Sequence, residues 1–289
     1  MTQLEEMPDR TMDVVQIVGA VISMYNAVEV YVCAFSTFKK YNTLYCWSVL
    51  ACATGLLLQS ISWMFIYYKL YSNKYLIMAI VASSVGWWAM VTGFSLTLYS
   101  RLTIVDVPRA YCDWIRNLII FNFLFCHLPT TMFTFGARMI GTDVWVTGYS
   151  VIEKIQVTMF LIQEVILSSM YVIHVGQGYG KEMKTVKRHT LYVNILVLIL
   201  DLVVVIVEYA GLFAIQVALK VAVYSIKIKL EFLILRQLTD ANKAFRRSTL
   251  GPVRSAGNRT ETPIKSNNGL GRKSNTHAEV FTSGSAIAL

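Results

Sequence analysis

The stretch of sequence that decides the fold is 191-LYVNILVLILDLVVVIVEYAGLFAIQVALKVAVYSIKIKLEFLILRQL-238. It predicts two hydrophobic helices joined by a tight turn at Tyr209-Ala210-Gly211. Polar residues recur every seven positions in the first helix, nearly two helical turns, so they lie on one stripe: Asn194, Asp201 and Glu208. The second helix has a polar stripe with spacings of four, four, three and four: Gln216, Lys220, Tyr224, Lys227 and Glu231.

Residues equally far from the turn of an antiparallel hairpin lie at equal depth. This rule predicts that Asp201 faces Lys220 and that Asn194 faces Lys227. A lone charge in the middle of a bilayer costs roughly 2.5–3.5 kcal/mol. We therefore interpret the opposed acids and bases as the polar spine of a membrane bundle. The turn is short, and a helix break inside one re-entrant element is the alternative.

Composition places the chain among polytopic membrane proteins. Its 289 residues are 55% apolar and 15% charged, whereas soluble domains have about 25% charged residues. The mean hydropathy is +0.53, and the apolar residues form runs of about 20, the length that spans a bilayer. The fold class we expect is all-α, a bundle of seven transmembrane helices in the plasma membrane or an endomembrane.

The expected organisation is a short arm over 1–12, a seven-helix domain over 13–238 and a disordered, basic, Ser/Thr-rich tail over 239–289. Pro129 is expected to kink the fourth span. The last two spans are the hairpin quoted above, and the first five are expected at about Asp13–Phe38, Thr43–Tyr68, Tyr75–Ser100, Asp113–Gly136 and Val144–Val175.

The distribution of positive charge predicts the orientation. The net charge of +9 could suggest nucleic acid, but basic residues gather in alternate loops and the tail, so no nucleic-acid partner is expected. The other side holds few, namely Arg10, Lys69, Lys74 and Arg138. The positive-inside rule then puts the N-terminus outside and the tail in the cytosol, where the sequon at Asn258 should stay unmodified. The basic-rich side holds Lys39, Lys40, Arg101, Arg109, Arg116, Lys181, Lys184, Lys187, Arg188 and eight tail residues.

Further polar residues fall inside other predicted spans. Gln156 and Gln163 share a face of the fifth span, and Glu164 beside them is deep. Asn26 and Glu29 lie deep on one face of the first span. Glu164, Glu29 and Asp201 give three buried carboxyl candidates against one clearly buried lysine, Lys220. Some of these acids are therefore expected to be protonated, and a functional cavity and a purely structural ion pair both stay open.

Small residues line one face of the third span, spaced four, three and four, which predicts close helix packing: Ala82, Gly86, Ala89 and Gly93. No catalytic set of Ser, His and Asp or of Cys and His is visible. The four histidines lack the spacing of metal ligands. We expect no catalytic residue, no metal and no cofactor.

Seven spans with the N-terminus outside is the topology of G-protein-coupled receptors and microbial rhodopsins, but the residue signatures of both are missing. A closer resemblance is carried by Gly86-Trp87-Trp88, Leu98-Tyr99-Ser100-Arg101-Leu102, Glu153-Lys154-Ile155-Gln156-Val157-Thr158 with Gln163-Glu164, Glu208-Tyr209-Ala210-Gly211, and Leu219-Lys220 with Tyr224-Ser225-Ile226-Lys227-Ile228-Lys229-Leu230-Glu231-Phe232. In these motifs the chain is similar to a fungal family of seven-span integral membrane proteins of unknown function, from about Val18 to Leu238. That resemblance implies the span count and no activity.

The leading hypothesis for function is a receptor-like sensor, with a small-molecule ligand in the polar pocket and a cytosolic signalling partner at the tail. One alternative is a transporter or proton-coupled channel that uses Asp201, Lys220, Glu164 and Glu29. Another is a small membrane enzyme of terpenoid type, in which a buried carboxyl such as Glu164 acts as the acid.

Overall fold

The computed structural model describes residues 9–38, 42–68, 75–104, 107–178 and 184–249. These residues contain only helices and their connections, so the predicted all-α class is confirmed for them. The helices are α1 Asp9–Thr37, α2 Leu44–Tyr67, α3 Leu76–Ile104, α4 Arg109–Asn122, the π-helical turn η2 Phe123–His127, α5 Leu128–Met139, α6 Asp143–Gly178, α7 Lys184–Tyr209 and α8 Phe213–Thr249.

Six helical stretches are long and apolar enough to cross a membrane, one of them the continuous rod α4–η2–α5. This confirms an integral membrane architecture with six apolar helices. The seventh rod, α8, is longer than any of them but carries Lys220, Lys227, Lys229 and Glu231 within one stretch of its sequence. α8 is therefore long enough to cross a membrane, and it differs from the six apolar stretches in the number of its charged residues.

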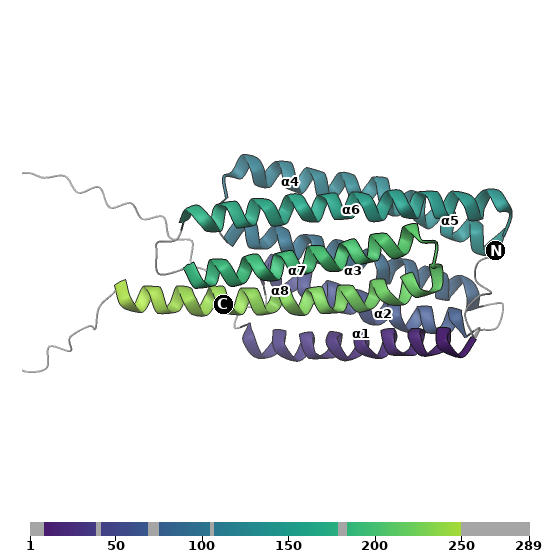
Figure 1. The fold of residues 1–289 in the computed structure, drawn as a ribbon, viewed down its shortest axis with the longest axis horizontal. Coiled ribbons are helices and arrows are strands. Elements are labelled where there is room, and N and C mark those ends of the chain that lie inside the picture. Colours follow the sequence, from purple (N-terminus) through teal and green to yellow (C-terminus); the bar gives the residue numbers. More distant parts are fainter. Residues whose placement is uncertain (1–8, 39–41, 69–74, 105–106, 179–183, 250–289) are drawn as a thin grey trace, which may run out of the picture.

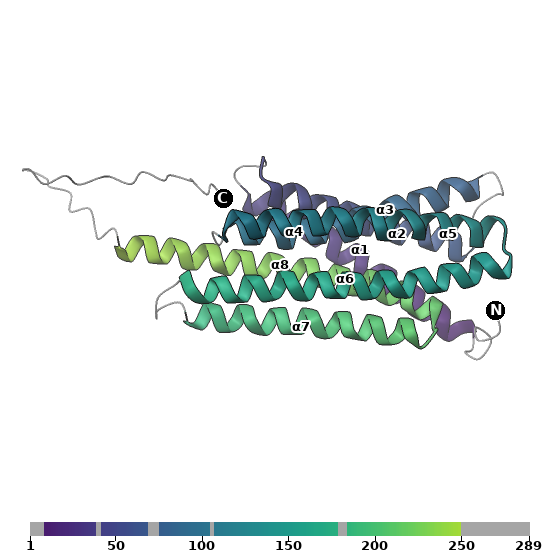
Figure 2. The ribbon, with the colours of Figure 1, turned by 90° about the horizontal axis from the view of Figure 1, so that it is seen from above.

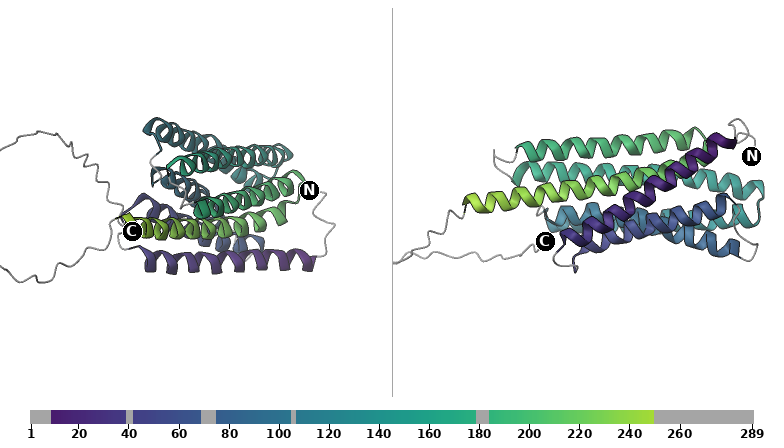
Figure 3. Two further views of the ribbon diagram at one scale, coloured as in Figure 1. Left: turned by 60° about the vertical axis from the view of Figure 1, so that its left-hand side comes forward. Right: turned by 90° about the horizontal axis from the view of Figure 1, so that it is seen from below.

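The rods run side by side along one axis, and α8 lies among them (Figure 1). It packs against α1, α2, α3 and α7. We call the end of the bundle with the α7–α8 turn the turn end, and the end from which α8 projects the tail end (Figure 2). Helix α1 crosses the bundle obliquely, in contact with both α8 and α2 (Figure 3). The most charged helix is thus shielded by its neighbours.

Two helices extend past the predicted domain boundaries. The structure begins α1 at Asp9, inside the predicted arm, and continues α8 to Thr249, past the predicted start of the tail at Thr239. The segment added to α8 contains Ala, Lys and Arg, which favour helix, and no Gly or Pro to stop it. The loop lysines Lys39, Lys40, Lys69, Lys74 and Lys181 and the rest of the tail, including Asn258, lie outside the described residues.

The region of the predicted kink contains a π-helical turn. Phe123–His127 forms one wide turn directly before Leu128-Pro129, and the rod continues on both sides of it. Proline lacks an N–H group and its ring clashes with the carbonyl four residues earlier, here that of Phe125. A wider turn removes both conflicts, and single π-helical turns inside α-helices are the form such adjustments take.

Helices α2 and α3 approach each other at glycines. A Cβ atom built on Gly55 would lie 2.4 Å from the backbone nitrogen of Met90. One on Gly86 would lie 2.6 Å from the nitrogen of Gln59, and one on Gly93 would lie 2.7 Å from that of Cys52. Two glycines of the small-residue stripe on α3 therefore touch the backbone of α2, whereas Ala82 and Ala89 are half-buried. No side chain larger than hydrogen fits at the three glycines unless the helices separate.

Replacing Gly86 by alanine should push α2 and α3 apart. Overpacking of this kind costs about 1–3 kcal/mol, so the Gly86→Ala protein should unfold at a lower temperature in detergent than the unmodified protein. Val85→Ala is the matched control, because Val85 on the same helix is 47% exposed. Equal melting temperatures for the Gly86→Ala protein and the unmodified one would show that the close approach is not required.

Candidate functional site

The layer of charge nearest the turn end is built around Lys220 of α8. Its ammonium lies 2.8 Å from Oε1 of Glu153 on α6 and 3.1 Å from Oε2 of Glu208 on α7. The Gln216 amide, one helical turn away, donates hydrogen bonds to both carboxylates. We call Lys220, Glu153 and Glu208 the turn-side triad; all three are buried.

A second layer lies deeper, around Lys227. Its Nζ lies 2.7 and 2.6 Å from the two carboxylate oxygens of Glu164 and 2.5 Å from Oδ1 of Asp201. The ammonium is also 4.5 Å from the ring centroids of Phe94 and Tyr224, where cation–π attraction stabilises it. Lys227 has no exposed surface. We call Lys227, Glu164 and Asp201 the central triad.

The third layer lies toward the tail end, where Arg101 of α3 meets Glu231 of α8. The closest atoms, Nη1 and Oε2, are 2.7 Å apart, and neither side chain is more than 1% exposed. They are not aligned as a hydrogen bond, so the contact is an electrostatic one. The guanidinium lies 4.4 Å above the ring of Tyr171, and its Nη2 donates to Asn194 at 3.5 Å.

The predicted pairing of Asp201 with Lys220 is wrong, and so is that of Asn194 with Lys227. Asp201 binds Lys227, and Lys220 binds Glu208, a shift of seven residues along α8. Helical side chains point toward the N-terminus of their own helix. In an antiparallel pair, the lysine of α8 therefore extends toward the turn end while the acid of α7 extends toward the tail end. The two side chains therefore meet although their Cα atoms lie at different depths, seven residues apart along α8. The sequence rule compared only the depths of the Cα atoms.

Sequence reasoning missed two partners. Arg101 counts as a loop charge in the sequence because it lies in the last turn of α3, yet it is fully buried. Glu153 lies in the first third of the fifth predicted span and was not among the residues expected in the polar core, yet it binds Lys220. The signal that could reveal them is the long α8 stripe: its charges at Lys220 and Glu231 each require an opposite charge from another helix.

The other predicted polar residues lie at the sides of these layers. Gln163 bonds Asn122 at 2.7 Å and Ser95 at 2.8 Å, linking α6 to α4 and α3. Gln156 accepts from the Thr130 hydroxyl at 2.6 Å. The two residues predicted on α1 do not join the triads, because they contact α8 on its other side: Asn26 bonds Ser225 at 3.0 Å, and Glu29 bonds Lys229 at 2.5 Å.

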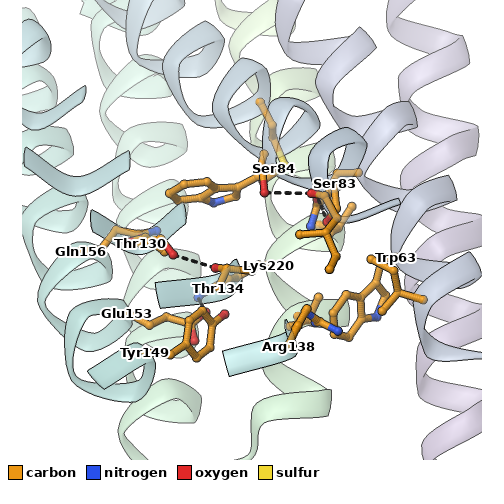
Figure 4. A pocket seen from close by; sticks show the side chains of 17 residues that line it. Trp63, Ser83, Ser84, Thr130, Thr134, Arg138, Tyr149, Glu153, Gln156 and Lys220 are labelled. Atoms are coloured by element: carbon orange, nitrogen blue, oxygen red, sulfur yellow. Dashed lines mark hydrogen bonds and ion pairs between the residues drawn. The ribbon is translucent and has the colours of Figure 1, made fainter. Parts of the chain in front are cut away.

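Two cavities adjoin the triads. The larger, about 80 Å³, lies at the turn end and is lined by Arg138, Tyr149, Glu153 and Lys220 (Figure 4). The smaller, about 30 Å³, is lined by Lys220, Glu164 and Asp201. Lys220, Gln156 and Trp87 line both cavities. A polar cavity needs about 10–15 Å³ to hold one water molecule, so both have room for water.

The buried charges do not balance. The three layers contain three cations, Lys220, Lys227 and Arg101. They contain five carboxyls, Glu153, Glu164, Asp201, Glu208 and Glu231. Each triad therefore has one carboxyl more than its lysine neutralises, and Oδ2 of Asp201 has no hydrogen-bond partner among the described residues.

Buried His127 lies apart from these layers. It belongs to the π-helical turn, its Nε2 is 3.0 Å from the Thr92 hydroxyl, and its ring centroid is 4.4 Å from that of Trp87. Among the residues that the structure describes, no three His, Cys, Asp or Glu side chains are grouped so that they could hold a metal ion. The chemistry open to the site is proton and ion binding by carboxyls, lysines and arginines.

Comparison with known proteins gives a family without a known activity. A family model described as a domain of unknown function, DUF7703, matches residues 9–253. The chain belongs to this family, and the match covers all the helices described above. None of the curated proteins and none of the solved structures compared with the chain matches it.

Removing the Lys227 ammonium should destabilise the bundle far more than removing that of Lys229. Lys227→Met leaves two buried carboxyls without their cation, and breaking a buried ion pair costs about 3–5 kcal/mol. Lys229 and Glu29 are 38% and 35% exposed, and an exposed pair contributes about 0–1 kcal/mol. Unfolding followed in detergent measures both changes.

Restoring charge balance provides the control for this prediction. The triple variant Lys227→Met, Asp201→Asn, Glu164→Gln removes the lysine and both carboxylates, so it should recover most of the lost stability. If the triple variant is as unstable as Lys227→Met alone, the loss comes from packing and not from unpaired charge.

Proposed function

We propose that this member of the DUF7703 family is a seven-span integral membrane protein that couples transport to proton movement. The observation that supports this function best is the pair of stacked triads, each with an unneutralised carboxyl, joined by two adjacent cavities. Intramembrane carboxyls that face a water-filled cavity are typical of proton relays. The transporter alternative from the sequence is thus the one that the site geometry favours.

The surplus carboxyl of each triad is the proposed proton site. Two carboxylates beside one ammonium leave a net negative charge in a medium of low dielectric, which is costly. In the central triad, one proton shared by Glu164 and Asp201 removes that charge, because two neighbouring carboxyls cannot both ionise easily. In the central triad, Oδ2 of Asp201 is the carboxylate oxygen without a hydrogen-bond partner among the described residues.

The cavities supply the route between the triads. Lys220 lines both, so its ammonium lies between the cavity at the turn end and the carboxyls of the central triad. Water in the two cavities would connect Glu153 to Glu164 and Asp201 through hydrogen bonds. A proton that enters at the turn end can then reach the centre of the bundle without an isolated charge crossing hydrocarbon.

The tail end of this route is the proposed gate. The buried Arg101–Glu231 pair lies beyond the central triad, and neither of the two cavities is lined by Arg101 or Glu231. A transporter needs its binding site to be accessible from one end of the bundle while the other end is closed. A channel, in contrast, needs a continuous pore. Opening toward the tail end would require α3 and α8 to separate at this pair.

The proposed topology has α8 as the seventh span, the N-terminus outside and the tail in the cytosol. The position of α8 among α1, α2, α3 and α7 supports a crossing beside them, because its lysines are neutralised by those neighbours and by α6. The orientation rests on the excess of basic residues in the tail-end loops. The plasma membrane and an endomembrane both fit.

Protease protection in sealed microsomes should show opposite locations for the two ends. With an epitope tag on each end of the full chain, the N-terminal tag should be protected and the C-terminal tag digested, and the sequon at Asn258 should carry no sugar. Protection of both tags would place both ends in the lumen, which would mean that the chain crosses the membrane an even number of times and that α8 does not span it. Glycosylated Asn258 would reverse the orientation.

Neutralising the central carboxyls should abolish proton-coupled flux. In proteoliposomes with a pH-sensitive dye inside, the unmodified protein should acidify the lumen when the outside is made acidic, and Asp201→Asn or Glu164→Gln should reduce that rate to the empty-liposome background. Glu29→Gln is the matched control, because Glu29 lies outside the triads. Unchanged rates in the Asp201 and Glu164 variants would contradict the relay.

The receptor-like hypothesis is supported by the same cavity at the turn end, which is partly open and has polar as well as apolar side chains in its lining. If the protein is a receptor that signals through its tail, deleting residues 250–289 should silence its response to ligand. If it is only a transporter, the same deletion should leave proton flux unchanged. The enzyme alternative has less support, because Lys227 contacts both oxygens of its proposed acid, Glu164.

A further inference from the structure

We infer that the cavity at the turn end binds a short monocarboxylate anion through Arg138, and that this anion is the species carried with the proton. The inference rests on the proposed transport function and names its substrate class. It also makes a separate claim about binding, which can be tested without any measurement of transport.

Arg138 is the cation of this cavity that has no acid of its own. The side chain is half-buried near the end of α5, and it forms no ion pair with any residue that the structure describes. Its guanidinium lies 5.3 Å from the Trp63 ring centroid, which holds the planar group in place. Arg138 and Trp63 lie on one side of the cavity, and Glu153, Tyr149 and Lys220 lie on the opposite side (Figure 4).

The ligand that suits this group is a carboxylate. A guanidinium offers N–H donors in a planar fork that matches the two oxygens of a carboxylate. The hydroxyls nearby are already engaged as donors, since Ser83 donates to Gln59, Ser84 to Ile80 and Thr134 to Thr130. Arg138 is therefore the charged donor of the lining that binds no acid among the described residues, and an anion can bind it.

The size of the cavity restricts the anion to a short one. Its volume of about 80 Å³ has room for about five or six water molecules, whereas pockets for drug-sized ligands measure about 300–1,000 Å³. Apolar side chains complete the lining, among them Ile66, Ile80 and Val217. A carboxylate with a chain of two or three carbons places its charge on Arg138 and its apolar end against these residues.

Charge balance couples the anion to a proton. Arg138 and Lys220 contribute two positive charges, and Glu153 and Glu208 contribute two negative charges, so the empty site is neutral. An anion that binds Arg138 adds one negative charge, and one proton taken up by Glu153 or Glu208 restores neutrality. A bound anion would then favour the uptake of a proton beside it, so the two would move in the same direction, and the anion would raise proton entry above the rate that a pH gradient alone drives.

The test uses the full chain in proteoliposomes and pyruvate as the probe, because its acid is strong enough that little crosses lipid unaided. A pyruvate gradient should drive proton entry, and Trp63 beside Arg138 should report pyruvate binding through its fluorescence. Arg138→Gln should weaken binding roughly tenfold or more, the size of a lost charge-assisted hydrogen bond. Arg138→Lys keeps the charge and should retain part of the binding.

Arg116→Gln is the control, because Arg116 is exposed and pairs with exposed Asp113; it should behave as the unmodified protein. A melting measurement on each variant shows whether it is folded. Proton flux that ignores pyruvate, with no fluorescence change in the unmodified protein, would overturn this inference and leave the proposed function intact. Pyruvate binding that requires Arg138 in a protein without any proton flux would support the anion site and overturn the proposed function.

Discussion

The need to neutralise charge inside hydrocarbon determines this structure. Lys227 has no exposed surface, and an ammonium in that position is tolerated only with acids beside it. Glu164 from α6 and Asp201 from α7 supply those acids, so one side chain of α8 fixes the depth and rotation of two other helices. Lys220 repeats the arrangement two turns closer to the turn end, with Glu153 and Glu208.

This requirement explains why the most charged helix, α8, lies among the others. Around it, the outward faces of the bundle are strongly apolar, with Val14 of α1, Trp47 of α2, Met78 of α3 and Ile199 of α7 each about half exposed or more. Those faces suit lipid. The α2–α3 contact at glycines and the π-helical turn before Pro129 then bring the polar groups of α2, α3 and α5 close enough to line the cavity at the turn end.

Sequence patterns predicted the elements of this arrangement better than its pairings. The seven-residue repeat of acids on α7 and the stripe on α8 identified the polar helices, because helical periodicity is local. The pairing failed, because it depends on how far a lysine extends and in which direction, as Lys227 and Asp201 illustrate. Arg101 and Glu153 were missed because burial near the end of a helix is set by neighbouring helices. The partner of Gly86 on α2, Gln59, has no local signal at all.

The claim on which the account depends is that the central lysine, Lys227, is shared by two carboxyls, Glu164 and Asp201, that hold one proton between them. Infrared spectroscopy of the reconstituted protein at neutral pH detects this state directly, because a protonated carboxyl has a C=O stretch that an ionised one lacks and that shifts in D₂O. We predict such a band in the unmodified protein, and its loss or shift in the Asp201→Asn and Glu164→Gln proteins. A spectrum without any protonated carboxyl would contradict the account.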